Sequence, residues 1–270
     1  MIYIYSLVLL TMLAFSGNAI LTRAALYSFN MDPELVLLLR VSSGAITLLL
    51  ISYLGKYSLK ILSRLHFKTA AALSLYLIAF SYAFTNLETG IGVLIQFGVV
   101  QLVMFSSSFF TNPKIPKNKS IGAIIAFSGL IYLLWPSENF TLNMTASVLM
   151  AIAGMAWGIY SLLGKTAVSA ISATTASFVI STPICLILVI LLPSDSDFSW
   201  SNTGALLAIA SGSIMSGIGY ALWYYILPKI PSTNAVVSQL SVPLIAAAGG
   251  MIFMQELITL KFILSCVLVL

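Results

Sequence analysis

Residues 14–23 read AFSGNAILTR and residues 156–165 read AWGIYSLLGK, so the same order of small, aromatic and basic residues recurs at an offset of 142 positions. At an offset of 143 positions, Gln96 in another apolar stretch aligns with Gln239. One such match among apolar residues can arise by chance, but a nearly constant offset across separate stretches is harder to dismiss. The pattern therefore indicates that the chain is a tandem repeat, which decides its architecture.

The composition identifies lipid as the solvent for most of the surface. Of the 270 residues, 60% are hydrophobic and 7% are charged, and the mean hydropathy is +1.07. A soluble domain carries about 25% charged residues, so this chain cannot cover a water-facing globule of its size. The first apolar stretch, residues 3–21, has no basic n-region and no small-residue cleavage site. We interpret it as a first membrane span and not as a signal peptide.

The apolar runs predict an all-α, polytopic membrane protein with ten transmembrane helices. A bilayer core about 30 Å thick needs roughly 20 helical residues per crossing, and backbone polar groups in lipid must be satisfied within the segment. The predicted helices cover residues 3–24, 33–54, 68–86, 89–110, 118–135, 143–164, 172–192, 203–227, 233–254 and 258–270. The last run is too short to cross, so we expect the tenth helix to be truncated here and to continue past Leu270.

Ten helices and one repeat divide the chain into two halves, residues 1–136 and residues 137–270, with five helices each. Because five is an odd number, the second half must enter the membrane from the side opposite to the first. The chain is therefore predicted to contain two inverted five-helix repeats. Inverted repeats recur in secondary transporters, in which the substrate binds between the halves near the midplane.

The charges orient these helices. With the N-terminus in the cytoplasm, nine of the twelve basic residues fall in inner loops, and all seven acids fall at outer loops or outer helix ends. The positive-inside rule therefore predicts an inner-membrane protein with both termini in the cytoplasm. The formal charge of +5 is a topology signal, and we expect no nucleic-acid partner. The nine basic residues are Lys56, Lys60, Arg64, Lys68, Lys114, Lys117, Lys119, Lys165 and Lys229; the acids are Asp32, Glu34, Glu88, Glu138, Asp195, Asp197 and Glu256.

The ninth predicted helix carries a local motif. Pro243 is followed by small residues, by Gly250 seven positions on and by Glu256 thirteen positions on. This motif resembles that of the drug/metabolite transporter superfamily, EamA type. The resemblance implies ten helices in two inverted halves and the export of amino acids or other small metabolites. The first half departs from the motif, with Val100 where the proline would stand and Pro113 where the glutamate would stand.

Few ionisable residues lie inside the predicted helices. Arg40, which resembles an arginine often found in the second helix of that superfamily, lies about 10 Å inside the outer end of its helix at 1.5 Å per residue. It could reach the lipid headgroups, pair with Glu34 or Glu88, or contact a substrate carboxylate. Because no helix carries a mid-membrane acid suited to a proton relay, the sequence favours facilitated diffusion or exchange.

Neutral polar and aromatic side chains form the candidate substrate site. Several of them pair through the repeat, which places one polar cluster in the outer half of the bilayer and one in the inner half. Each residue alone could instead supply an interhelical hydrogen bond. An aromatic-rich neutral cavity suits amphipathic solutes such as aromatic or apolar amino acids. The predicted substrate-binding residues are Asn18, Tyr82, Gln96, Trp157, Tyr160, Tyr225, Ser238 and Gln239, paired as Asn18 with Tyr160, Tyr82 with Tyr225 and Gln96 with Gln239.

Together these features predict a secondary transporter that moves small metabolites, in particular aromatic or apolar amino acids, outward by alternating access. We expect no cofactor and no metal, contact with membrane lipid, and an organisation compatible with a monomer. A passive channel is the alternative, although no filter loop or repeated charge ring is visible. A multipass membrane enzyme would need a nucleophile with a base, a metal cluster or paired carboxylates, and the predicted helices show none of these.

Overall fold

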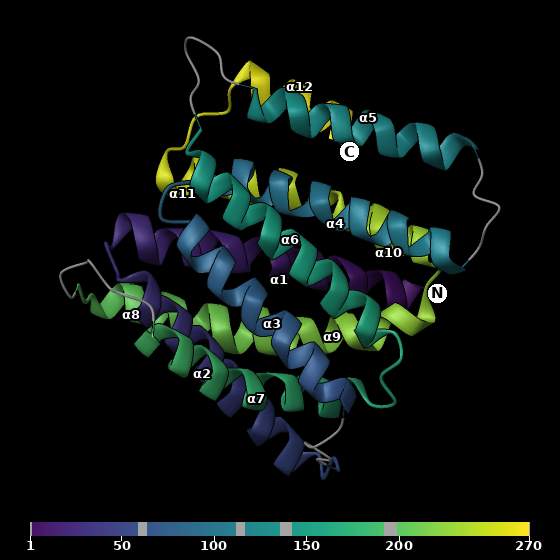
Figure 1. Ribbon diagram of the computed structural model, residues 1–270. Coiled ribbons are helices and arrows are strands. Elements are labelled where there is room, and N and C mark those ends of the chain that lie inside the picture. The colour runs from purple at the N-terminus through teal and green to yellow at the C-terminus, as the bar shows by residue number, and fades with distance from the viewer. Residues whose placement is uncertain (1, 59–63, 112–116, 136–141, 192–198, 270) are drawn as a thin grey trace.

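A computed structural model describes residues 2–58, 64–111, 117–135, 142–191 and 199–269. Within these ranges the regular structure is helical throughout, which confirms the predicted all-α class (Figure 1). The helices are α1 (Ile2–Arg23), η1 (Ala24–Ser28), α2 (Pro33–Leu54), α3 (Arg64–Ala83), α4 (Thr89–Thr111), α5 (Lys117–Leu134), α6 (Met144–Gly164), α7 (Ala170–Leu191), α8 (Asn202–Ala210), η2 (Ser211–Ile218), α9 (Gly219–Ile226), η3 (Leu227–Lys229), α10 (Ser232–Gln239), α11 (Ser241–Met254) and α12 (Leu260–Val269).

Seven helical segments of the described chain are long and apolar enough to cross a membrane. The number of ten crossings therefore stays a prediction. α3 carries Arg64 and Lys68 in its first two turns, and α12 has ten residues in the described part of the chain. The seven segments are Tyr3–Ser28, Pro33–Leu54, Thr89–Ser107, Met144–Gly164, Ala170–Leu191, Asn202–Lys229 and Val237–Met254.

Local sequence explains where several helices begin. The Asp32 side chain accepts a hydrogen bond from the backbone N–H of Glu34 at 2.9 Å, and Pro33 occupies the first position of α2, where its missing N–H costs nothing. Asn143 caps α6 in the same way, accepting from the backbone N–H of Ala146 at 3.0 Å. These caps fix the starts of two helices that carry residues of the site.

The helices pack in a pattern that brings the two halves of the chain together. α3 packs along α6 and α7, and α2 packs along α7 and η2. α4 packs along α6 and α11, and α1 packs along α11, η2 and α9. α5 and α12 pack on each other and lie as an outer pair beyond α4 and α11, whereas α2 and α7 lie at the opposite edge (Figure 1). The bundle interior is thus built from α1, α3, α4, α6 and the segment η2–α9.

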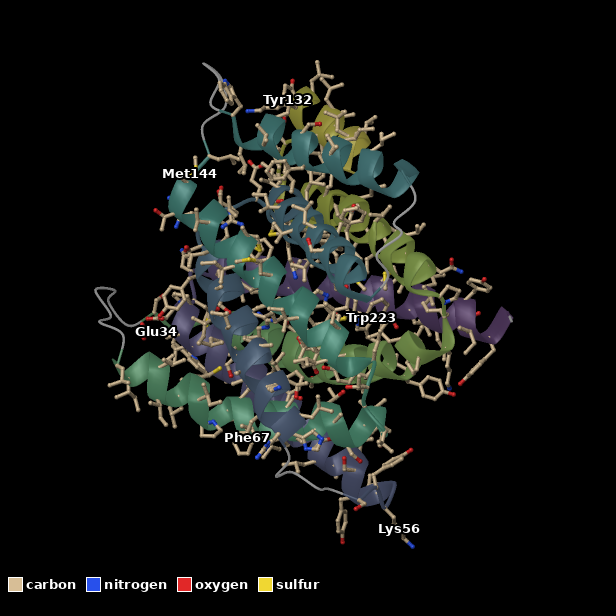
Figure 2. All side chains as sticks on the ribbon, turned by 45° about the vertical axis from the view of Figure 1, so that its right-hand side comes forward. Glu34, Lys56, Phe67, Tyr132, Met144 and Trp223 are labelled. Carbon is tan, nitrogen blue, oxygen red and sulfur yellow. The ribbon has the colours of Figure 1, made fainter. Side chains whose placement is uncertain are left out.

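The outward face of the bundle is apolar and its described charges gather at the two ends. Large hydrophobic side chains are exposed along the helices, for example Tyr53, Ile252 and Phe253. Figure 2 shows Glu34 and Lys56 at opposite ends of α2. A wide apolar belt between two charged ends is what a bilayer requires of a protein that crosses it.

Candidate functional site

A cavity of about 10 Å³ lies among α1, α3, α4, α6 and α9. This volume accommodates roughly one water molecule, so an amino acid would enter only after the surrounding helices move apart. Every lining side chain is buried. Six aromatic rings and two amides form the walls: Phe15, Tyr76, Phe80, Phe97, Trp157 and Tyr220, with Asn18 and Gln96.

The aromatic rings contact one another around the cavity. The ring centroids of Trp157 and Tyr220 are 4.6 Å apart, and Phe15 meets Trp157 edge-on at 5.1 Å. Tyr76 lies 5.1 Å from Phe80 on the same helix. Edge-on contacts, with ring centroids about 4.5–7 Å apart, are among the favourable arrangements of aromatic pairs. The rings therefore present a rigid apolar wall to any solute that enters.

Asn18 is the centre of the polar network beside the cavity. Its side-chain Nδ2 donates to the hydroxyl of Tyr76 at 2.9 Å and to the hydroxyl of Tyr220 at 3.2 Å. The Tyr220 hydroxyl in turn donates to that of Tyr76 at 2.9 Å. Asn18 Oδ1 accepts from the guanidinium of Arg40 at 2.9 Å. One amide thus links α1 to α2, α3 and α9.

A π-helix supplies two further donors to the same oxygen. Ser211 and Ser216, five residues apart in η2, both donate to Asn18 Oδ1, at 2.7 and 3.1 Å. A π-helix closes its hydrogen bonds between residues five apart, which brings these two hydroxyls to one face, and π-helical turns occur frequently at functional sites. This segment interrupts the α-helical geometry between α8 and α9.

Close packing of backbones holds Arg40 in place. A Cβ atom built on Gly212 would lie 2.2 Å from the backbone oxygen of Arg40, so only glycine lets η2 approach α2 this closely. The guanidinium carbon lies 4.9 Å from the centre of the Phe80 ring, and the side chain is fully buried. Arg40 therefore stands directly behind two cavity-lining residues, Asn18 and Phe80.

Aromatic side chains close the bundle on the side of the cavity toward Lys165. Trp157 lies 5.5 Å from Tyr160, which stacks on Tyr224 at 4.7 Å. The Tyr224 hydroxyl donates to the backbone oxygen of Tyr160 at 2.9 Å, and Trp223 Nε1 donates to the hydroxyl of Ser161 at 3.2 Å. Figure 2 shows Trp223 inside the bundle. We call Tyr160, Trp223 and Tyr224 the aromatic closure.

Charged groups close the bundle on the other side. Arg23 Nε lies 3.5 Å from Glu256 Oε1, and its Nη1 donates to the backbone oxygens of Phe84 and Thr85 at 2.7 and 3.1 Å. Glu256 also accepts from Thr89, through the backbone N–H at 2.8 Å and through the hydroxyl at 3.0 Å. We call Arg23, Thr89 and Glu256 the ionic closure.

Two neighbours shape this ionic closure. Gln255 ends α11 in the left-handed conformation, with φ 57°, and the backbone N–H of Glu256 then bonds back to the oxygen of Gly250 at 3.2 Å. Glu88 lies in the loop before α4. Burial raises the pKa of its carboxyl, and the negative charge of Glu256 raises that pKa further, whereas the positive charge of Arg23 lowers it. The turn after α11 thus sets a carboxylate between α1 and α4.

The structure places the predicted site residues in three environments. Asn18, Gln96 and Trp157 line the cavity. Tyr160 and Gln239 lie next to it: Tyr160 packs against Trp157, and Trp157 Nε1 donates to Gln239 Oε1 at 3.4 Å.

The other three predicted residues lie away from the cavity. The Tyr82 hydroxyl donates to Glu34 at 3.1 Å, near the start of α2. Tyr225 is exposed, with the ammonium of Lys229 over its ring. The Ser238 hydroxyl donates to the backbone oxygen of Asn234. Within the described residues, no three His, Cys, Asp or Glu side chains group in a way that could hold a metal ion.

Sequence reasoning missed several residues that the structure brings to the cavity. Tyr76 and Tyr220 were not predicted as site residues, although they are 144 positions apart, close to the repeat offset. That spacing is the signal that would have found them. The serines of η2 carry no such signal, because their role depends on a π-helix that no local pattern predicts.

Comparison with known proteins adds independent findings. Residues 144–270 match the EamA-like transporter family. An uncharacterized protein of Pseudomonas aeruginosa is 33% identical over 250 residues, which cover 93% of this chain and 86% of that protein. The uncharacterized transporter YoaV of Bacillus subtilis is 21% identical over 251 residues, 89% of this chain and 85% of that protein. A protein crystal structure matches with a TM-score of 0.73 at 15% identity over 99% of this chain and 93% of that one, which supports the fold.

Proposed function

The chain belongs to the EamA-like transporter family of the drug/metabolite transporter superfamily, and from this premise we propose that it is a secondary transporter for aromatic or apolar amino acids. It is an integral, multi-pass membrane protein. We further propose that it works as a facilitator or exchanger and moves its substrates outward by alternating access.

The observation that carries this proposal is the position of the cavity between two different closures. The aromatic closure lies on one side, where Tyr160 packs on the cavity-lining Trp157. The ionic closure lies on the other side, where Arg23 binds the backbone oxygen of Phe84, whose ring packs on the cavity-lining Phe80 at 4.6 Å. An alternating-access carrier needs one closure on each side of its site, so that one can open while the other stays shut.

The packing pattern supports ten helices in two inverted repeats, residues 1–136 and 137–270. If α8–η2–α9 is the eighth predicted helix, α10–α11 the ninth and α12 the tenth, the main contacts pair up under a shift of five. The contact between α3 and α6, the third and sixth helices, has its counterpart in the contact between the eighth helix and α1. The contact between α4 and α6, the fourth and sixth helices, likewise has its counterpart in the contact between the ninth helix and α1. Contacts that recur in this way are expected of two structurally equivalent halves, and two equivalent halves could exchange their conformations during transport.

The described charges support an inner-membrane orientation with both termini in the cytoplasm. The acids Asp32, Glu34, Glu88 and Glu256 lie near helix ends on the side of the ionic closure, whereas Lys56 follows the other end of α2. Placing the basic end inside agrees with the positive-inside rule. In this orientation the ionic closure faces outward and the aromatic closure faces the cytoplasm.

Counterflow in liposomes tests the proposal. Purified protein is reconstituted with unlabelled L-phenylalanine or L-leucine inside, and uptake of the labelled amino acid is measured. A carrier gives saturable uptake that is accelerated by substrate on the opposite side. Linear uptake that does not depend on substrate on the opposite side would indicate a channel, and the absence of uptake for both would reject aromatic and apolar amino acids as the substrate class.

A matched pair of variants makes this assay specific. Trp157→Ala removes a ring from the cavity wall, and Ile252→Ala removes a side chain that is 67% exposed on the outer face of α11. The first variant should lose counterflow and the second should keep it. Equal activity of both variants would show that the cavity is not the transport site.

A further inference from the structure

Two arginines are buried in the described bundle, and they differ in their partners. Arg23 has the carboxylate of Glu256 and two backbone oxygens. Arg40 is fully buried, and among the described residues it makes one hydrogen bond, from Nη2 to the neutral amide oxygen of Asn18. Its Nε and Nη1 are buried without any hydrogen-bond partner. Among the described residues, no carboxylate lies within ion-pair distance of Arg40.

This arrangement leaves a positive charge without compensation. An arginine side chain carries five N–H donors and keeps its charge in proteins. Burying such a charge without a counter-ion carries a large free-energy cost. The ring of Phe80 offsets part of this cost through its π face, but a ring accepts no strong hydrogen bond. A buried and under-compensated charge marks a functional site in a membrane protein by default.

The surroundings of Arg40 are rich in donors and poor in acceptors. Asn18 Oδ1 accepts from Arg40, Ser211 and Ser216 at once, although an amide oxygen has two lone pairs. The cavity-lining residues include no acid. A carboxylate that took the place of Asn18 Oδ1 at Nη2 would also accept from one of the two unpartnered nitrogens, Nε or Nη1, and the planar fork of arginine matches carboxylate geometry.

We propose that Arg40 binds the carboxylate of the transported solute, and that Asn18 Oδ1 holds the place of one carboxylate oxygen in the described conformation. This inference rests on the proposed transport function. The solute class is an amphipathic carboxylate whose apolar part packs on the rings of the cavity. Amides and amines of the same shape are excluded, because an amide brings no charge and an amine brings the wrong one.

The first test compares the two arginines without any added solute. Arg40→Met removes an uncompensated charge and should leave the melting temperature of the detergent-solubilised protein unchanged or raise it. Arg23→Met is the matched control, and because it breaks an ion pair it should lower the melting temperature. If Arg40→Met lowered the melting temperature as much as Arg23→Met does, Arg40 would be a structural anchor and the proposal would fail.

The second test compares matched acids and amides by thermal shift. The pairs are 3-phenylpropanoate with 3-phenylpropanamide, L-phenylalanine with its amide, and L-leucine with its amide. We expect an acid from these pairs to stabilise the wild type while its amide does not. Arg40→Met should weaken that binding at least about tenfold, and Arg40→Lys, which keeps the charge, should retain part of it. Equal shifts from acid and amide, equal shifts in Arg40→Met, or no shift from any acid would overturn the proposal.

Counterflow separates this inference from the transport function itself. If the acids bind in an Arg40-dependent way but none shows counterflow, the transporter proposal fails and the carboxylate site stands. If the amides show counterflow that Arg40→Met retains, the transporter proposal stands and the carboxylate site fails.

Discussion

The two closures beside the cavity hold the helices together by different chemistry. The ionic closure joins α1, α4 and the turn after α11 through one carboxylate that meets Arg23 and Thr89. The aromatic closure joins α6 and α9 through the stacked rings of Tyr160 and Tyr224 and through two hydrogen bonds, from Tyr224 to the backbone oxygen of Tyr160 and from Trp223 to the hydroxyl of Ser161. One contact depends on charge and the other on packing.

This difference predicts how the stability of each closure should respond to substitutions and to pH. An ion pair shielded from water is lost as a unit when one partner goes, because the remaining charge stays buried. An aromatic contact is lost in proportion to the surface removed and does not respond to pH near neutrality. Truncation, charge removal and titration should therefore affect the stability contributed by the two closures differently.

Truncating the aromatic closure should give the largest effect. Tyr224→Ala removes a ring that packs against Gly164 and stacks on Tyr160. Loss of a large buried ring should lower the free energy of unfolding by about 3 kcal/mol. Tyr224→Phe loses only the bond to the Tyr160 oxygen and should cost about 1 kcal/mol. Denaturant titration in detergent micelles measures both, and equal losses would show that the ring packing contributes little.

Removing the charge of the ionic closure should give the next effect. Glu256→Gln leaves Arg23 buried without its ion-pair partner, but its two backbone acceptors remain. We therefore expect a loss of about 2–3 kcal/mol, somewhat less than the roughly 3–5 kcal/mol typical of broken buried pairs.

A double-mutant cycle with Arg23→Met isolates the pair. If the ionic closure acts as a unit, the double variant should be no less stable than Glu256→Gln alone. Strictly additive losses would contradict the assignment of this pair as a coupled closure.

The helical class could be predicted because a chain that crosses lipid must satisfy all of its backbone hydrogen bonds internally, which few structures can do. Composition alone requires helices once strands are excluded from isolated crossings, and α2 was predicted at residues 33–54, where the structure has Pro33–Leu54. The predicted helix at residues 203–227 instead contains the π-helix Ser211–Ile218. That break is stabilised by contacts with Asn18 and Arg40, which come from distant parts of the chain.

The site was harder to predict because the internal repeat indicates which helices contribute to it but not which side chain of each helix faces the cavity. A shift of one residue turns a helical side chain by about 100°. Tyr225 was predicted and is exposed, whereas Tyr224 beside it is buried in the aromatic closure. Asn18 was recognised as polar within a helix, but its five partners come from α2, α3, η2 and α9, which only the fold brings together.

A smaller effect on stability is expected from Gln96, which lies between the closures. Gln96→Leu should impair counterflow because it removes an amide from the cavity wall. If Gln96 served only to pack helices, the change would spare transport and lower stability by around 0.6 kcal/mol, the average for such bonds in membrane bundles. Transport and unfolding measured on one variant distinguish the two roles.

Cysteine labelling tests from which side of the membrane positions 96 and 239 are accessible. Single cysteines at positions 96 and 239 are treated with a membrane-impermeant thiol reagent in oriented vesicles. Position 96 should react from the side of the ionic closure and be protected by substrate, and position 239 should react from the side of the aromatic closure. If neither position reacts from either side under any condition, the two-sided path is wrong.

Titration of Glu88, which lies beside the ionic closure, should give the smallest effect. Burial and the charge of Glu256 raise the pKa of Glu88 above its ordinary value of 4.5, so the folded protein holds this proton more tightly than the unfolded chain. The contribution of Glu88 to stability is therefore present at low pH and is lost as the pH rises through the window above 4.5. Wild-type protein should melt at a progressively lower temperature as the pH is raised from 5 toward neutrality. Glu88→Gln should flatten that slope and Tyr224→Phe, at the aromatic closure, should keep it. A slope that is unchanged in Glu88→Gln would show that the pH response lies elsewhere in the protein.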